Sequence, residues 1–317
     1  MSVRVGFVGY GGIAKAHQQS VVLSGMGKIV GGMDIELKQR QRFEEEAKAP
    51  SFTCFKEMLD KAEPEAVIVS TPPNVRLEIV RECAERGIGV LCEKPLAHNV
   101  ESARELAAIS KGAKNICAVA FCHRFNPGIN RMKQLFEDGV LGEPIEFVNF
   151  FVGSSSWCGE VWRTDINISG GGCLMDNGSH SIDIFQYLFG RVEKAAGATR
   201  NVWPGRGDDT ACLLVTSESG VIGQITVSWM YPFGAATVEV IGSKGAAKFD
   251  YSVIDELKIR IGKDEWKTEK ITKDTRFVDQ MKAFLSAVGG NQNGQLASFE
   301  DGLTAVEIIG KIYKDRL

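Results

Sequence analysis

The chain has 317 residues, of which 44% are hydrophobic and 24% charged, and its formal net charge is −3. This length predicts about two domains, and the apolar content is enough for full cores. Because there is no basic excess to neutralise phosphates, the composition argues against nucleic-acid and anionic-membrane partners. No run of 18 or more apolar residues occurs, so we expect no membrane-spanning helix.

The eight cysteines and four histidines indicate neither a disulfide framework nor a metal site. No two cysteines form a C-x-x-C pair, and a chain of this length does not depend on disulfides for a core. The histidines show no ligand spacing; they are His17, His98, His123 and His180. A strand begins by Val3, which leaves no room for a signal peptide. Together with reduced thiols, this predicts a cytoplasmic protein.

The first 120 residues alternate between short apolar runs and helical stretches. Such alternation indicates buried parallel strands joined by right-handed helical crossovers. The predicted strands are 3–8, 29–33, 66–70, 88–92 and 116–120; after a first helix ending near residue 23, the predicted helices are 35–47, 74–86 and 100–110. We therefore expect residues 1–121 to form an α/β domain whose parallel sheet is covered on both faces.

The pattern changes near Phe121, beyond which strands follow one another with turns between them. The predicted strands are 145–152, 192–199, 210–216, 221–229, 236–241, 246–251 and 257–261, and the predicted helices are 127–137, 179–188, 277–288 and 299–316. This predicts an α+β domain over residues 122–317 with a large, mainly antiparallel open sheet.

A glycine motif, Gly9-x-Gly11-x-x-Ala14, directly follows the first strand and opens a helix. The first glycine permits a tight turn, and the second lets a pyrophosphate approach the backbone at the positive end of the helix. Alanine in the third place still allows close helix–strand packing. The alternative is a plain strand–helix turn, but the flanking elements favour a dinucleotide-binding Rossmann domain over residues 1–121.

Asp34 ends the second predicted strand. A carboxylate at this place accepts hydrogen bonds from the adenosine ribose and repels a 2′-phosphate, which favours NAD over NADP. Two observations leave NADP possible. Asp34 also fits a helix N-cap before Ile35, and Lys38 lies one turn further on.

Lys94 lies just after the fourth predicted strand and ahead of Pro95. The carboxyl ends of such strands face the ligand cleft, where an ammonium stabilises a developing alkoxide or polarises a carbonyl. A solvated surface lysine is the alternative. Glu93 beside it is interpreted as a supporting residue.

Asp176 and His180 follow the run Gly170–Gly172 and begin a predicted helix. At a spacing of four they share one helical face, so the histidine suits general acid–base catalysis and the aspartate suits orienting it. A helix-capping aspartate and a core histidine are the alternatives. Asp183 and Tyr187 continue this face, either as ligands or as support.

Motifs in both halves of the chain carry a family resemblance. They are Gly9-Tyr10-Gly11-Gly12-Ile13-Ala14, Thr71-Pro72-Pro73, Glu93-Lys94-Pro95-Leu96-Ala97, Trp162-Arg163, and the run from Gly170 to Asp183. Their order resembles the glucose–fructose oxidoreductase and inositol dehydrogenase (Gfo/Idh/MocA) family of NAD(P)-dependent oxidoreductases. This resemblance spans essentially the whole chain. It implies a Rossmann domain followed by an α+β domain that binds substrate and commonly forms oligomer contacts through its open sheet.

The resemblance also assigns site residues. The catalytic set corresponds to Lys94, Asp176 and His180. The cofactor set corresponds to Gly9, Tyr10, Gly11, Gly12, Ile13, Asp34, Thr71, Pro72, Asn74, Arg76, Glu93, Lys94, Trp162 and Arg163. The substrate set corresponds to Lys94, His123, Arg163, Asp176 and His180.

Two departures from the family pattern stand out. Arg76 occupies a place where relatives often carry histidine, and Cys122 one where they often carry asparagine. We expect Arg76 to line the cofactor side of the cleft and to alter charge preference there. His123 and Arg124 border the cleft, and packing of the interdomain linker is an equal alternative for both.

The implied reaction is reversible hydride transfer between nicotinamide and a secondary alcohol or ketone of a sugar or cyclitol. In it, Lys94 holds the substrate oxygen, His180 takes the hydroxyl proton and Asp176 fixes the histidine or an adjacent hydroxyl. Two alternatives are a redox-neutral NAD-dependent glycosidase and a non-catalytic dinucleotide-binding sensor. We expect a homo-dimer or homo-tetramer, with specificity set by loops 153–160 and 201–208.

Overall fold

The chain divides into two compact units. In the computed structural model, which describes residues 2–154, 161–202, 206–291 and 294–315, one unit comprises 1–122 with 276–303 and the other 123–275 with 304–317. The sequence places 276–303 in the second domain. In the structure this segment belongs to the first unit, because α10 (Arg276–Val288) packs beside α1 (Gly12–Ser24).

The first unit is built on a seven-stranded sheet in the order β15-β6-β5-β4-β1-β2-β3. Its strands are β1 (Val3–Val8), β2 (Gly27–Met33), β3 (Ser51–Phe52), β4 (Ala66–Val69), β5 (Gly89–Cys92), β6 (Cys117–Val119) and β15 (Ala297–Ser298). Only β15 among these described strands pairs antiparallel, with β6. Strands β2 and β3 follow β1 toward one edge of the sheet. Strands β4, β5 and β6 follow one another from β1 toward the other edge. The predicted Rossmann-type parallel sheet is therefore confirmed.

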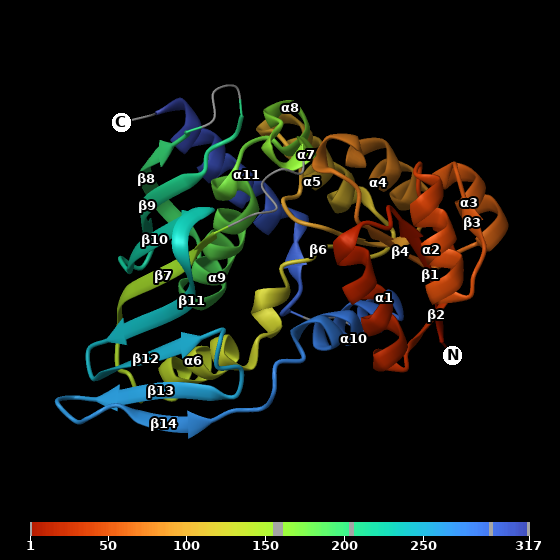
Figure 1. The fold of residues 1–317 in the computed structure, drawn as a ribbon. Coiled ribbons are helices and arrows are strands. Elements are labelled where there is room, and N and C mark those ends of the chain that lie inside the picture. The colour runs from red at the N-terminus through yellow and green to blue at the C-terminus, as the bar shows by residue number, and fades with distance from the viewer. Residues whose placement is uncertain (1, 155–160, 203–205, 292–293, 316–317) are drawn as a thin grey trace. The chain divides into compact units, whose positions relative to one another are not determined.

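Helices flank this sheet, with α1 beside α10 and α4 (Arg76–Glu85) beside α5 (Val100–Gly112) (Figure 1). The remaining helical elements of this unit are α2 (Leu37–Ala47), α3 (Phe55–Ala62) and η1 (Pro73–Val75). Two more, η2 (Cys122–Phe125) and α11 (Phe299–Lys314), begin in this unit and continue into the second. The helix predicted over residues 74–86 begins differently in the structure. Because Pro73 begins a 3₁₀ turn that continues into α4, the N-cap position falls at Val75 and makes no side-chain bond.

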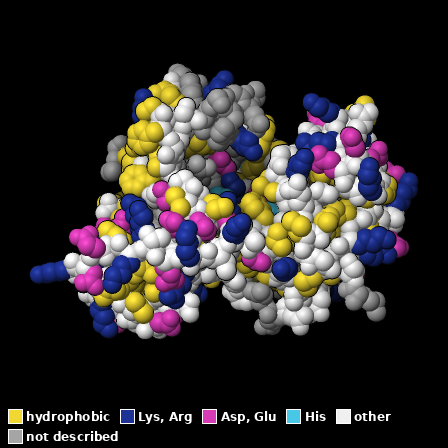
Figure 2. All heavy atoms as spheres, turned by 60° about the horizontal axis from the view of Figure 1, so that its bottom comes forward, with side chains coloured by type: hydrophobic (Ala, Val, Ile, Leu, Met, Phe, Trp, Pro, Cys, Tyr) yellow, Lys and Arg dark blue, Asp and Glu magenta, His cyan; other side chains and the backbone are white. Residues whose placement is uncertain are grey.

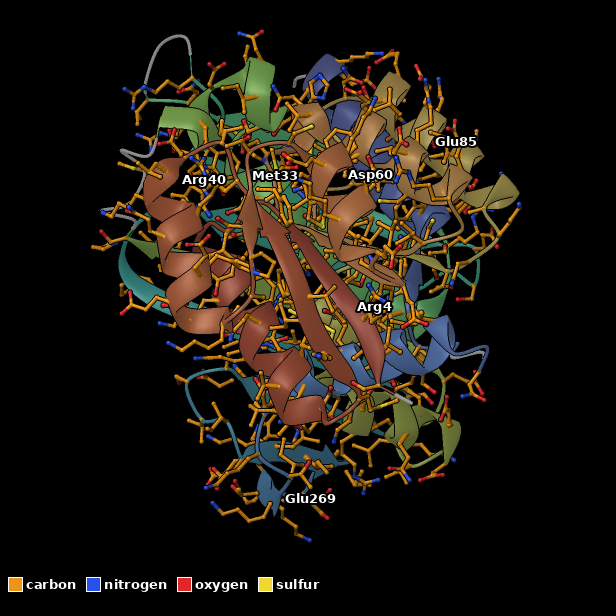
Figure 3. All side chains as sticks on the ribbon, turned by 90° about the vertical axis from the view of Figure 1, so that its right-hand side faces the viewer. Arg4, Met33, Arg40, Asp60, Glu85 and Glu269 are labelled. Atoms are coloured by element: carbon orange, nitrogen blue, oxygen red, sulfur yellow. The ribbon has the colours of Figure 1, made fainter. Side chains whose placement is uncertain are left out.

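The central strands consist of buried apolar residues. Every residue of β4 and β5 is buried, as parallel strands covered on both faces require. Figure 3 shows Met33, the last residue of β2, and Arg40 on α2 at the same end of the sheet, whereas Arg4 in β1 lies toward the other end. The end marked by Met33 is the carboxyl end, at which the loops with the predicted cofactor residues begin.

The second unit is built on an eight-stranded sheet in the order β14-β13-β12-β11-β7-β10-β9-β8. Its strands are β7 (Pro144–Ser154), β8 (Val192–Arg200), β9 (Thr210–Ser217), β10 (Ile222–Ser228), β11 (Met230–Gly242), β12 (Gly245–Asp250), β13 (Glu256–Ile261) and β14 (Lys267–Lys270). Strand β10 runs parallel to β7, and the other described pairs are antiparallel. This confirms the predicted mainly antiparallel sheet.

Helices cover one face of the second sheet. The elements in contact with its strands are α6 (Pro127–Glu137), a π-helical turn η4 (Leu174–Gly178) and α9 (Ser179–Phe189). Two short helices, α7 (Val161–Thr164) and α8 (Ile166–Ser169), contact each other. Phe185 and Phe189 of α9 make edge-to-face ring contacts with Phe147 of β7 at centroid distances of 5.6 and 6.2 Å. Aromatic burial of this kind fixes α9 to the sheet.

The other face of this sheet carries exposed apolar side chains. The strand register places Phe150, Leu214 and Ile222 on this face, with exposed fractions of 37%, 58% and 49%. Polar residues such as Gln224 and Glu146 alternate with them and form a hydrogen bond. We call this surface the open sheet face.

Charged side chains of both signs are interspersed on the molecular face drawn in Figure 2, which fits the small net charge. Within the described part of the chain, no helix is both long enough and apolar enough to cross a membrane.

Candidate functional site

The glycine loop after β1 combines one tightly packed glycine with one that borders open space. Gly9 has a φ of +85°, and a Cβ there would lie 2.9 Å from the backbone nitrogen of Thr71. Gly11 has an ordinary φ of −72°, and a Cβ there would meet no protein atom within 4 Å. Gly9 is thus required by the fold, whereas Gly11 leaves room for a ligand to approach the backbone.

The start of α1 suits a phosphate group. Its N-cap, Gly11, makes no side-chain cap bond to the amides of the first turn. Ala14 is fully buried, as close helix–strand packing requires. Gly12 and Ile13 of the same turn are exposed and half-buried. Uncapped amides at the positive end of a 13-residue helix, beside open space, fit the pyrophosphate of NAD.

Asp34 lies directly after β2 and faces the glycine loop. Its Oδ2 accepts the Tyr10 backbone N–H at 2.7 Å, and its Oδ1 accepts that of Glu36 at 2.8 Å. The N-cap of α2 is Glu36, so Asp34 is not a helix cap. Each carboxylate oxygen of Asp34 has a further lone pair, so Asp34 can also accept hydrogen bonds from ribose hydroxyls.

The Tyr10 side chain points into the core, so only its backbone faces the loop. Its buried ring packs edge-to-face on Phe43 at 4.9 Å, and its hydroxyl bonds Glu46 at 3.0 Å. Burial raises the pKa of this hydroxyl, and the Glu46 charge adds to the shift. Arg42, which sequence reasoning missed, donates to the carbonyls of Tyr10 and Gly11 at 2.7 and 3.1 Å. It therefore holds the loop in place.

The turn after β4 packs against the glycine loop. The Thr71 backbone lies beside Gly9, and the half-buried Pro72 follows it. Asn74 is exposed in η1. Thr71 and Pro72 thus lie at the carboxyl end of the sheet, beside the glycine loop.

The segment carrying Lys94 is held by a buried carboxylate. Glu93 Oε1 lies 2.7 Å from His17 Nε2, and Glu93 Oε2 accepts the Lys94 backbone N–H at 3.1 Å. Burial alone would raise the pKa of Glu93. The hydrogen bond with His17 and electrostatic interactions with His17, Lys94 and Arg76 outweigh it and hold the pKa below its usual value. His17 escaped sequence reasoning because its partner lies 76 residues away.

Arg76 does not line a cleft as expected. Its side chain is buried, with an exposed fraction of 2% for the residue. Its guanidinium donates to the carbonyls of Thr71, Glu93 and Pro95. The structure thus gives Arg76 backbone partners in its own unit, because α4 carries the side chain inward beneath the turns after β4 and β5.

In the second unit, Asp176 and His180 lie at the junction of two helix types. Asp176 is in the π-helical turn η4, and His180 is the second residue of α9. The sequence predicts one α-helical face for both, but the wider π turn changes their relative direction. Both side chains are half-buried. Single π turns of this kind are frequent at functional sites.

The structure brings His123 and His180 together. Their rings meet edge-to-face at a centroid distance of 4.5 Å. Tyr251 and Phe151 complete the cluster, at 5.1 and 5.4 Å from the His123 ring. His123 therefore supports one side of the predicted catalytic imidazole.

Arg124 and Asp183 form a buried ion pair. The Arg124 guanidinium donates hydrogen bonds to the Asp183 carboxylate, from Nη2 at 2.7 Å and from Nε at 3.0 Å. Arg124 also lies 5.5 Å from the Tyr187 ring, whose hydroxyl donates to Asn130 at 2.9 Å. Asp183 and Tyr187 thus anchor α9 beside α6, which favours support over ligand binding.

Trp162 and Arg163 lie in α7, with the guanidinium carbon 4.7 Å from the indole ring. Both side chains are half-buried. The carbonyl of the next residue, Thr164, accepts the backbone N–H of Gly207 at 2.9 Å. This bond ties α7 to the segment that includes Asp208.

Asp208 organises the glycine-rich turn before η4, and sequence reasoning missed it. Its carboxylate, 5% exposed as a residue, accepts the backbone N–H groups of Gly172 and Leu174 at 2.9 and 2.8 Å. It also accepts the Tyr313 hydroxyl at 2.5 Å and the Cys173 thiol at 3.1 Å. Burial, with the Asp208 charge, raises the pKa values of both donors, so they stay protonated.

The predicted site residues divide between the units. Lys94 and the cofactor loop belong to the first, and His123, Arg163, Asp176 and His180 belong to the second. Parts of the predicted specificity loops, residues 155–160 and 203–205, lie outside the described residues.

Two family models match this chain. Residues 3–121 match the oxidoreductase family with an NAD-binding Rossmann fold, and residues 129–248 match the GFO/IDH/MocA C-terminal domain. The chain belongs to the Gfo/Idh/MocA family. This confirms the resemblance, and it identifies the chain as an oxidoreductase whose first unit carries an NAD-binding domain. The open space at Gly11, the uncapped start of α1 and Asp34 all fit that cofactor.

Members of the Gfo/Idh/MocA family with similar sequences span nearly all of this chain. "Uncharacterized oxidoreductase YrbE" of Bacillus subtilis strain 168 is 26% identical and covers 96% of this chain and 91% of its own. "Inositol 2-dehydrogenase 2" of Paenarthrobacter aurescens strain TC1 is 26% identical, covering 96% and 93%. A solved levoglucosan dehydrogenase in complex with NADH and levoglucosan has a TM-score of 0.90 at 22% identity, covering 99% and 97%, which shows the shared fold.

Proposed function

We propose that this protein is an NAD-dependent dehydrogenase that moves a hydride between nicotinamide and a secondary alcohol or ketone of a sugar or cyclitol. The observation that carries the proposal is the way each unit holds its functional group. In the first, which carries the NAD-binding loop, the buried carboxylate of Glu93 holds the Lys94 backbone. In the second, an aromatic cluster supports His180. The similarity to an inositol 2-dehydrogenase favours a polyol substrate.

In this proposal Lys94 binds the substrate oxygen. Its ammonium stabilises the negative charge that develops on that oxygen as the proton leaves. When bound, NAD supplies the acceptor for the hydride. The loop residues bind and orient: amides at the start of α1 hold the pyrophosphate, and Asp34 holds the ribose.

His180 is the general base, taking the hydroxyl proton through its imidazole. Asp176 orients that ring or binds an adjacent hydroxyl. His123 packs against His180 and limits its rotation. General acid–base help of this kind is worth about 10²–10⁴ in rate.

A panel of sugars and polyols, read by nicotinamide absorbance with NAD and NADP, tests the activity. For a substrate found active, Lys94→Ala and His180→Ala should each lower kcat by about 10²-fold or more while NADH affinity changes little. Lys61→Ala, at an exposed site on α3, is the matched control. Wild-type turnover in Lys94→Ala would refute the proposed mechanism. Free sugar released without net NADH would instead indicate a glycosidase.

Cofactor preference follows from Asp34 in this proposal. Replacing Asp34 with alanine removes the carboxylate that would repel a 2′-phosphate, so the ratio of kcat/KM for NAD to that for NADP should fall. An unchanged ratio would mean that Asp34 holds the glycine loop and does not determine the preference between NAD and NADP.

The open sheet face is proposed as the contact for a homo-dimer or homo-tetramer. Exposed Leu214 and Ile222, interleaved with polar residues, suit a self-complementary interface. Light scattering should find an oligomer that Leu214→Glu converts to a smaller species. A monomeric wild type would refute this assignment.

The protein is further proposed to work in the cytoplasm. The seven cysteines in the described part of the chain are all free thiols, and five of them are buried. Free thiols suit a reducing compartment. Cell fractionation of the tagged protein tests the assignment.

A further inference from the structure

Arg76 forms hydrogen bonds with the backbone on both sides of Lys94. Its Nη1 donates to the carbonyls of Glu93 and Pro95, the two residues flanking Lys94. Its Nε and Nη2 donate to the Thr71 carbonyl at 3.1 and 2.7 Å. All three guanidinium nitrogens therefore donate to backbone carbonyl oxygens. The residue is buried, with an exposed fraction of 2%.

Only a guanidinium has the donors for this arrangement. Its rigid planar fork presents five N–H groups, whereas a lysine ammonium is a single point and an imidazole offers at most two donors. A buried guanidinium without such partners would be strongly destabilising, so the contacts are required for its burial. Arg76 thus joins the turn after β4 to the turn after β5.

The side-chain contacts of Glu93 complete the arrangement. Its carboxylate binds His17 on one oxygen and the Lys94 N–H on the other. The Lys94 backbone is held through its own amide and through the carbonyls before and after it. Few degrees of freedom then remain for its Cα position.

We propose that Arg76 is a positioning residue for hydride transfer, which fixes the backbone from which the Lys94 ammonium reaches the substrate oxygen. This inference rests on the proposed function of Lys94. It replaces the expectation that Arg76 tunes cofactor or substrate charge directly. A displacement of about 1 Å at a catalytic group is worth roughly 10²-fold in rate.

Kinetics of Arg76→Ala and Arg76→Lys test the inference on an active substrate. Both variants should lower kcat by about 10²-fold while KM for NAD and the NADH dissociation constant stay near wild type. Methylguanidinium should restore turnover of Arg76→Ala saturably, and methylammonium should not. Arg81→Ala, at an exposed site on the same helix, is the matched control.

A double variant shows whether Arg76 acts through Lys94. Arg76→Ala combined with Lys94→Ala should be no slower than Lys94→Ala alone, because residues that act as a unit are not additive. Full additivity, or wild-type kcat in both Arg76 variants with only a lower melting temperature, would overturn the inference. If Lys94→Ala itself keeps wild-type turnover, the proposed function fails instead.

Hydrogen exchange gives a readout that does not depend on turnover. Backbone amides of the peptide 93–97 should exchange faster in Arg76→Lys than in wild type, and Arg81→Ala should leave them unchanged. Unchanged exchange in this peptide, in a folded Arg76→Lys protein, would also overturn the inference.

Discussion

The Tyr313 hydroxyl donates a hydrogen bond of 2.5 Å to the buried carboxylate of Asp208. Tyr313 lies in the last helix, α11, whereas Asp208 also binds the backbone of the turn before Asp176 and His180. The end of the chain is thus linked to the turn that introduces the predicted catalytic helix. Within the second unit, the Asp208 carboxylate therefore accepts hydrogen bonds from both the last helix and that turn.

Loss of this bond should destabilise the protein. Tyr313→Phe removes one hydrogen bond to a charged acceptor, worth about 1.5–3 kcal/mol. Asp208→Asn should cost more, because an amide offers one acceptor oxygen to four donors. Thermal melting of both variants checks this, with Tyr231→Phe, in strand β11, as the control. A Tyr313→Phe midpoint equal to that of wild type would show the bond to be unimportant for stability.

The two glycines of the NAD-binding loop should respond differently to a methyl group. Gly11→Ala places a Cβ in open space at an ordinary φ, so stability should stay within about 1 kcal/mol of wild type. NADH affinity should fall at least about tenfold, or 1.4 kcal/mol, because the methyl blocks the pyrophosphate. Fluorescence titration with NADH measures this.

Gly9→Ala is the complementary variant. Its positive φ and the 2.9 Å approach to Thr71 should lower the melting midpoint directly. If Gly11→Ala binds NADH as tightly as wild type, the pyrophosphate does not lie over this glycine.

The buried pair of Arg124 and Asp183 should show strong coupling. Arg124→Met leaves a buried carboxylate without this partner, which costs about 3–5 kcal/mol. Adding Asp183→Leu should recover part of that loss. The exposed pair of Lys61 and Glu57 provides a control cycle worth about 0.5 kcal/mol or less. A coupling energy no larger than this control would contradict the structural role of the buried pair.

Glu93 should make stability fall in acid. Its folded-state pKa lies below the usual value of 4.5, so the folded protein holds the charged form more strongly than the unfolded chain does. Its contribution is full above pH 4.5 and is lost as the pH falls through the folded-state pKa. Melting temperatures of wild type and Glu93→Gln, compared between pH 7 and pH 3, check this. A difference that stays constant or grows in acid would contradict the assignment.

Some elements were predictable because their own residues determine them. The apolar runs of β1, β4 and β5 are buried almost throughout, as their composition predicts. The short strands β3, β14 and β15 were not predicted. They have two to four residues and pair at sheet edges, so their positions follow from the neighbouring strand rather than from their own pattern.

The glycine motif, Asp34 and the alternation of strands and helices could be read along the chain, because each depends on spacing between near neighbours or on a run of apolar side chains. The partners of the charged residues could not. Arg76 faces carbonyls up to 19 residues away, His17 meets Glu93 after 76, and Asp208 meets Tyr313 after 105. Whether a charge is exposed or buried depends on which distant segments pack around it, and only the tertiary structure decides that.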